Sequence, residues 1–131
     1  MPVPEKKISK PQDYKKMVLN LDIDNFELKT SSILEARMTL VGIERLEENL
    51  LEIRRDISRD MRSIKLKYLG HDHNKSSLLG SLKKTKASSR RKSLDNKCNR
   101  ELEPYNKVLY IVDHYLKEIE NVKDYINNLK T

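Results

Sequence analysis

The residues with the clearest chemical potential are six cationic side chains gathered in segment 81–93, SLKKTKASSRRKS, which contains no acidic residue. Cations clustered without carboxylates favour binding to a polyanion, because binding displaces counterions, and such binding weakens with salt. The segment has no aromatic residue on which single-stranded bases could stack. We expect it to contact nucleic-acid phosphates or another acidic surface, or else to be only a solvated loop. The expected contact residues are Lys83, Lys84, Lys86, Arg90, Arg91 and Lys92.

Most of the net charge of +7 comes from the same part of the chain. Residues 70–93 contain seven basic side chains and one acidic side chain, Asp72, whereas the stretches on either side are nearly balanced. The basic isoelectric point therefore describes one segment and not the whole surface.

Other polar groupings do not complete a catalytic or metal site. His71 and His73 lack the second pair of ligands that a structural zinc site needs. The stretch DIDNFE, 22–27, lacks the glycine and the final glutamate of a calcium loop. Carboxylates recur every four residues along the middle of the chain, which predicts a solvated helix face, because no pocket is indicated that would separate their pKa values. This acidic ridge consists of Glu44, Glu48, Glu52, Asp56 and Asp60. We therefore expect no enzyme activity, no metal and no cofactor.

A helical period organises the middle of the chain. Apolar residues recur at intervals of three or four, which predicts one helix over about 33–69. Ser32 followed by Glu35 is a capping-box pattern at its start, and Gly70 is the residue type that commonly follows the end of a helix.

The same period returns near the end of the chain. It predicts a second helix over about 94–130, kinked near Pro104 because proline removes one backbone hydrogen bond. Cys98 lies on the apolar seam of this helix and is expected to be a small buried residue and not a nucleophile. Two helices of matched length joined by a basic connector, about 70–93, predict an all-α fold, a long antiparallel two-helix hairpin of coiled-coil type.

A short N-terminal helical arm is expected to precede the hairpin. Pro11 suits a first helical turn, and the stretch 11–28 reads as a short helix followed by an extended linker. Four apolar residues share one face of that helix: Tyr14, Met17, Val18 and Leu21. Residues 1–10 are predicted to be disordered, and residues 11–131 to form a single domain.

The apolar faces of the two long helices widen toward the open end of the hairpin. A wide apolar stripe needs more than one partner to cover it, so we expect this end to meet the N-terminal segment or a second chain. The residues expected at this interface are Leu34, Met38, Val41, Leu51, Val108, Ile111, Tyr115 and Tyr125. The chain is accordingly expected to be a homo-oligomer or a subunit of a larger assembly.

Composition places the chain among helical proteins of reducing compartments. Hydrophobic residues make up 37% and charged residues 36%, with no tryptophan, which is typical of long helices with solvated faces. A single cysteine cannot form an internal disulfide, and no apolar run reaches the length of a membrane span. We expect a soluble protein, cytoplasmic or organellar, without integral membrane association.

The sequence is consistent with two functions. The first is a non-enzymatic helical hairpin that binds a polyanion through its basic connector. The alternative is a coiled-coil scaffold, adaptor or assembly subunit that acts through its apolar base.

Overall fold

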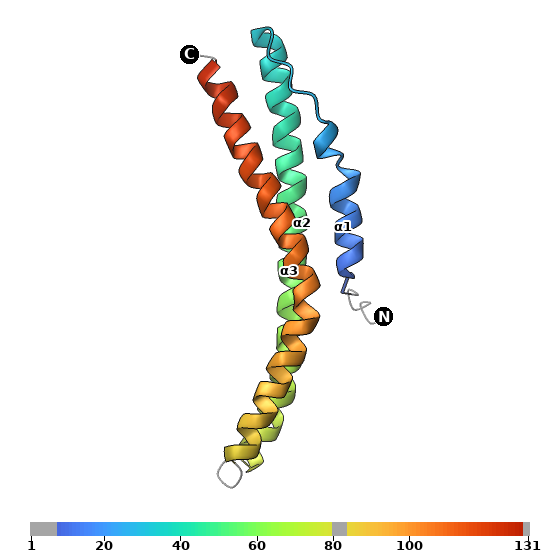
Figure 1. The fold of residues 1–131 in the computed structure, drawn as a ribbon, viewed down its shortest axis with the longest axis vertical. Helices are drawn as coiled ribbons and strands as arrows, with labels where there is room; N and C mark the ends of the chain where they lie inside the picture. The colour runs from blue at the N-terminus through green and yellow to red at the C-terminus, as the bar shows by residue number, and fades with distance from the viewer. Residues whose placement is uncertain (1–7, 80–83, 130–131) are drawn as a thin grey trace, which may run out of the picture.

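The chain folds into three α-helices and one short 3-10 helix, with no strand in the part that is described (Figure 1). The computed structural model describes residues 8–79 and 84–129, and the side chains of 69–91 lie outside that description. The expected all-α hairpin with a short N-terminal helical arm is confirmed. The elements are α1 (Pro11–Asn20), η1 (Ile23–Asn25), α2 (Ile33–Leu79) and α3 (Lys84–Leu129).

Helix α2 begins at the predicted cap but does not end at the predicted glycine. The Ser32 hydroxyl accepts a hydrogen bond from the Glu35 N–H at 3.1 Å, as the capping pattern predicts. The Glu35 carboxylate is used differently, because it accepts a hydrogen bond from the Ser31 hydroxyl. The helix then continues through Gly70 to Leu79. A glycine inside a helix destabilises it by only about 1 kcal/mol relative to alanine. This is too little to end a helix that packs against α3.

Helix α3 is also longer than predicted, since it starts at Lys84 and not near residue 94. The predicted connector, 70–93, is therefore mainly the end of α2 and the start of α3. Pro104 lies inside α3, which runs through it as one helix. In Figure 1 the path of α3 changes direction near this part of the helix. The lost hydrogen bond and the clash with the preceding turn account for the bend.

The two long helices run antiparallel. Along α2 from its far end toward its start, Tyr68 contacts Glu101 on α3, Arg54 contacts Asp113, and Glu47 contacts Lys123. These pairs have donor–acceptor distances of 2.6, 3.0 and 3.2 Å.

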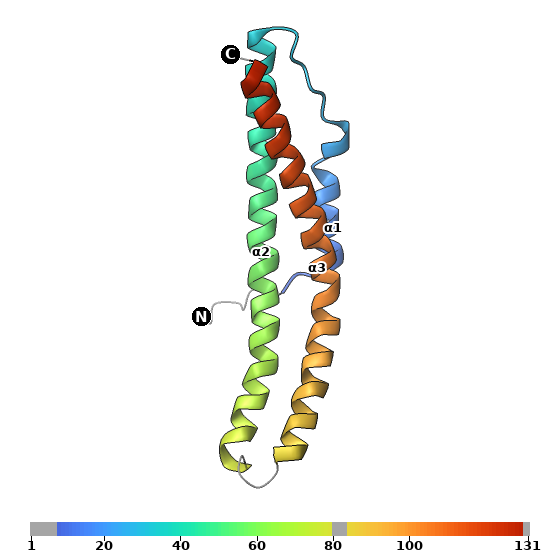
Figure 2. The same cartoon turned by 60° about the vertical axis from the view of Figure 1, so that its left-hand side comes forward.

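The molecule has two parts with different numbers of helices. Helix α1 lies beside one half of the hairpin only, and of the described elements the other half contains just α2 and α3 (Figures 1 and 2). We call the three-helix part the base, comprising 8–60 and 101–129. We call the two-helix part the arm, comprising 61–79 and 84–100.

One apolar core runs through both parts. The buried residues of α2 and α3 follow the predicted helical period, which confirms the seams read from the sequence. In α1 two of the four expected contact residues, Tyr14 and Val18, are buried, whereas Met17 is exposed. The buried apolar residues of the long helices are Ala36, Ile43, Leu50, Ile53, Ile57, Met61, Ile64, Cys98, Leu102, Tyr105, Val108, Val112, Ile119 and Ile126.

The linker between α1 and α2 packs closely on α2. A Cβ atom at Gly42 would lie 2.9 Å from Cζ of Phe26 and 3.0 Å from its Cε2. The absence of a side chain at Gly42 thus admits the Phe26 ring, and this explains a glycine in the interior of a long helix.

Candidate functional site

The six cations singled out in the sequence lie at or beside the start of α3. Lys83 is outside the described residues. The backbone of the next four is helical, while their side chains are outside the description. These four are Lys84, Lys86, Arg90 and Arg91. Lys92 is described and is exposed.

Five further cations belong to the same arm and were missed in the sequence. All are exposed, and none forms an ion pair with a carboxylate among the described residues. In sequence order these cations fall in long stretches that also contain many acidic residues, so no local excess of positive charge marks them. The antiparallel hairpin places the two stretches side by side. These residues are Arg62, Lys65, Lys67, Lys97 and Arg100.

The charge is therefore divided between the two parts of the molecule. Residues 61–100 contain 12 basic and 2 acidic side chains, namely Asp72 and Asp95. The remaining residues contain 15 basic and 18 acidic side chains. The arm is strongly cationic, and the rest of the chain is weakly anionic.

The described side chains of the arm include one aromatic group, Tyr68, whose hydroxyl is bound within the fold. Tyr68 donates a hydrogen bond from its hydroxyl to Oε2 of Glu101 at 2.6 Å. This hydrogen bond raises the pKa of Tyr68, so its hydroxyl stays a neutral donor. Among its described side chains the arm therefore offers an anion mainly charge, with this one half-buried ring as its aromatic surface.

The predicted apolar interface is divided by the structure. Val108 is buried, and Ile111 and Tyr115 are half-buried, because α1 and η1 pack over them. The Tyr115 hydroxyl lies 3.2 Å from Oδ2 of Asp24 in η1. For these three residues the covering elements are α1 and η1 of the same chain. The sequence could not distinguish this from a second chain. The other five expected residues are exposed: Leu34, Met38, Val41, Leu51 and Tyr125.

Most of the acidic ridge is a solvated face, as the sequence predicts, but that prediction is wrong for Asp60. Its side chain is buried, and Oδ2 accepts hydrogen bonds from the Tyr14 hydroxyl and, at 3.2 Å, from the Ser9 N–H. Nε of Arg59 lies 3.7 Å from Oδ1. The other four members of the ridge are exposed or half-buried. The periodic spacing could not show that the N-terminal arm would cover this one position.

The same contacts fix the start of the N-terminal arm. The Tyr105 hydroxyl donates to the Ser9 carbonyl at 2.8 Å, and the Tyr14 and Tyr105 rings meet edge to face with centroids 6.4 Å apart. Ser9 belongs to the stretch 1–10 that is predicted to be disordered, and its backbone is hydrogen-bonded here, while residues 1–7 of that prediction lie outside the described residues. Burial and the Asp60 carboxylate raise the pKa of Tyr14. We call Ser9, Tyr14, Arg59, Asp60 and Tyr105 the Asp60 cluster.

The Asp60 cluster uses its polar atoms within the fold. Asp60 is satisfied by the donors of its own chain, so it offers no free acid or base to a substrate. Burial also raises the pKa of the Cys98 thiol, which is opposite to what an activated nucleophile needs. Among the described residues, no group of three or more His, Cys, Asp or Glu side chains is arranged to hold a metal ion.

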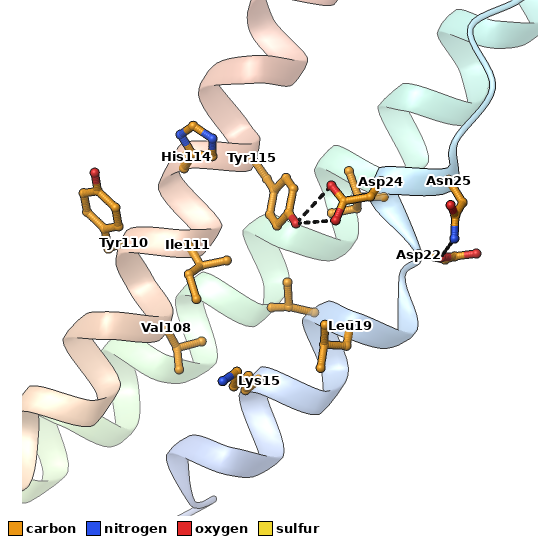
Figure 3. Close-up of a pocket in the computed structure, with 12 residues that line it drawn as sticks. Lys15, Leu19, Asp22, Asp24, Asn25, Val108, Tyr110, Ile111, His114 and Tyr115 are labelled. Carbon is orange, nitrogen blue, oxygen red and sulfur yellow. Dashed lines mark hydrogen bonds between the residues drawn. The ribbon is translucent and has the colours of Figure 1, made fainter.

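A groove lies between α1–η1 and α3, on the base of the molecule (Figure 3). Its volume is about 440 Å³. The floor is apolar, and the groove has a cation, Lys15, near one end and two carboxylates, Asp22 and Asp24, near the other. Asp22 has a φ angle of 52°, in the left-handed region, and its Oδ1 accepts a hydrogen bond from Nδ2 of Asn25.

The fold and the charge distribution define a helical hairpin protein with a three-helix base and a cationic two-helix arm. No protein-family model, no curated protein and no solved structure matches the chain. Within the described ranges, none of the helices has a stretch that is both apolar and long enough to cross a bilayer.

Proposed function

We propose that this chain is a non-enzymatic interaction protein whose arm binds a polyanion, with nucleic-acid phosphates as the preferred ligand. The observation that carries the proposal is the separation of charge. Residues 61–100 hold 12 basic and 2 acidic side chains, and the six described cations of the arm are exposed with no described carboxylate partner. A surface of this kind releases counterions when it meets a phosphate backbone.

The shape of the arm favours contact with backbone phosphates over reading of bases. The helical stretch 61–79 is about 30 Å long, and a pair of packed helices is about 20 Å wide. The major groove of a DNA duplex is about 12 Å wide and admits one helix. A two-helix arm therefore lies across the backbone, and contacts to phosphates carry no direct sequence information. The preferred ligand is a duplex, because segment 81–93 has no aromatic residue and the described side chains of the arm include only Tyr68 for single-stranded bases to stack on.

The experiment that tests this proposal is a titration of labelled duplex and single-stranded nucleic acid at two salt concentrations. Wild-type affinity for the duplex is expected to fall about 10³-fold between roughly 50 and 200 mM salt if about six phosphates are neutralised. An arm variant, with Ala at all six of the sequence-predicted cations, is expected to bind weakly and with a smaller salt dependence. A second variant replaces the five other described arm cations by Ala, namely Arg62, Lys65, Lys67, Lys97 and Arg100, and is expected to behave in the same way.

A matched control replaces six exposed cations of the base by Ala and is expected to bind as the wild type does. The control residues are Lys16, Arg37, Arg45, Arg55, Lys107 and Lys117. If the arm and control variants bind equally, or if the wild type does not bind at low salt, the arm is not a polyanion-binding surface.

The second candidate is a scaffold or adaptor that acts through the apolar base. It is favoured by Leu34, Met38 and Val41, which are exposed and share one face of α2 at its start. In that case the arm variants keep the affinity for a protein partner, and changes such as Met38→Asp remove it. The two candidates thus differ in which set of substitutions abolishes binding.

A further inference from the structure

The groove between α1–η1 and α3 carries an apolar rim that the chain itself leaves uncovered. Leu19 on α1 is 67% exposed, and Tyr110 on α3 is 77% exposed. Both line the groove, whose floor includes Val108 and Ile111 (Figure 3). Large apolar side chains on both sides of one groove mark it as a surface that a partner can cover.

The charges of the groove are arranged in a fixed order along its length. Lys15 lies near one end, and Asp22, which follows the end of α1, lies near the other. Leu19 lies close to the midpoint between them. Asp24, in η1, adds a second carboxylate at the acidic end.

We propose that this groove is the interface of an antiparallel homodimer. A twofold axis that passes near Leu19, perpendicular to α1, brings each Lys15 to the acidic end of the other copy's groove. Leu19 then meets the same residue of the other copy, as an isologous interface requires. Each dimer contains two such pairings of Lys15 with Asp22, together with an apolar centre.

The order of charges favours a second copy over other occupants. A purely basic peptide would be repelled at the Lys15 end, and a purely acidic one at the Asp22 end. A small apolar ligand would leave the two charged ends without new partners. A second copy supplies both signs in the reversed order, and it supplies exposed apolar side chains in the same interface.

The test is sedimentation equilibrium of the full chain over a wide range of protein concentration. The wild type is expected to form a dimer. Leu19→Asp places two carboxylates at the apolar centre, one from each copy, and is expected to raise the dimer dissociation constant about tenfold or more. The matched control is Met38→Asp, at an equally exposed apolar position of α2 outside the groove, and it is expected to leave the constant unchanged. Circular dichroism checks that both variants keep their helical content.

The charge pairing is tested by mixing two variants. In Lys15→Glu the new carboxylate faces Asp22 of the other copy, and in Asp22→Lys the new ammonium group faces Lys15 of the other copy, so each variant alone is expected to dimerise at least tenfold more weakly than the wild type. The mixture of the two is expected to form a heterodimer, because opposite charges then meet at both ends. Thermal melts of each variant alone verify that the chain is folded.

Three results would overturn this proposal. The wild type remains monomeric at the highest concentration, or Met38→Asp dissociates the dimer while Leu19→Asp does not, or the two charge variants, each folded, fail to associate when mixed. Each of these results leaves the binding of polyanions by the arm untouched, because the groove lies on the base.

Discussion

Removal of the Tyr14 hydroxyl is the sharpest test of how the N-terminal arm is held on the hairpin. In wild type this hydroxyl donates to the buried carboxylate of Asp60, whose other close donor is the Ser9 N–H. Tyr14→Phe keeps the ring, and so keeps the edge-to-face contact with Tyr105. The substitution changes one donor and little else.

The expected cost follows from the burial of Asp60, which is only 4% exposed. A hydrogen bond to a charged group contributes about 1.5–3 kcal/mol, and a buried carboxylate that loses a donor cannot replace it with bulk water. We therefore expect Tyr14→Phe to lower the free energy of unfolding by about 2 kcal/mol. Tyr110→Phe is the control, because Tyr110 is exposed and should change stability by less than about 0.5 kcal/mol.

The assay is urea unfolding followed by circular dichroism, at a fixed protein concentration for all three chains. A lower midpoint with an unchanged slope for Tyr14→Phe means that stability has changed and the denatured state has not. If Tyr14→Phe and Tyr110→Phe give the same midpoint, the Asp60 cluster does not stabilise the docking of α1.

Three further predictions concern pH, packing and thiol chemistry. Because the folded chain raises the pKa of Tyr14 above its ordinary value, its contribution to stability is present below about pH 10 and is lost as the pH rises above that value. Wild type should therefore lose more stability than Tyr14→Phe in unfolding experiments between about pH 9 and 11, and equal losses would contradict this. Gly42→Ala should stabilise the chain by about 1 kcal/mol when Phe26 is also changed to Ala, and by less in wild type, since a Cβ atom meets the Phe26 ring. A double-mutant cycle measures the difference, and additivity would refute the contact. Cys98 should react slowly with a thiol reagent until urea unfolds the chain, because burial raises the pKa of its thiol. Fast reaction in the folded state would contradict this.

Local patterns in the sequence were sufficient to predict the helices and their apolar seams. The helical period identified both long helices, and the cap at Ser32 is the one observed. These features depend on residues close together in the chain. The predicted helix ends on either side of the connector were wrong. Helix α2 continues past Gly70, because one glycine does not end a helix that packs against another, and α3 begins at Lys84.

Features that depend on which segments meet in space could not be read from the sequence. Asp60 has the same spacing as its exposed neighbours in the acidic ridge, and only the position of Ser9 and Tyr14 makes it a buried acceptor. Val108 has the pattern of an interface residue, and the covering element is α1 of the same chain.

Only part of the cationic surface could be predicted from the sequence, because its remaining residues are brought together by the fold. The sequence showed the compact run of cations before residue 93. The hairpin adds five exposed cations from two stretches that are far apart in the chain, and it separates them from the acidic base. Their grouping required the antiparallel pairing of α2 with α3.

Lysine footprinting in the presence of duplex nucleic acid tests most directly whether the arm is the binding surface. An amine-reactive reagent is applied to the free and bound chain, and modification is measured by mass spectrometry. The arm lysines Lys65, Lys67, Lys92 and Lys97 are exposed in the free chain, as are Lys16 and Lys117 on the base. We predict protection of the four arm lysines with unchanged modification of the two base lysines. Equal protection of both groups, or protection of the base alone, would contradict the assignment of binding to the arm.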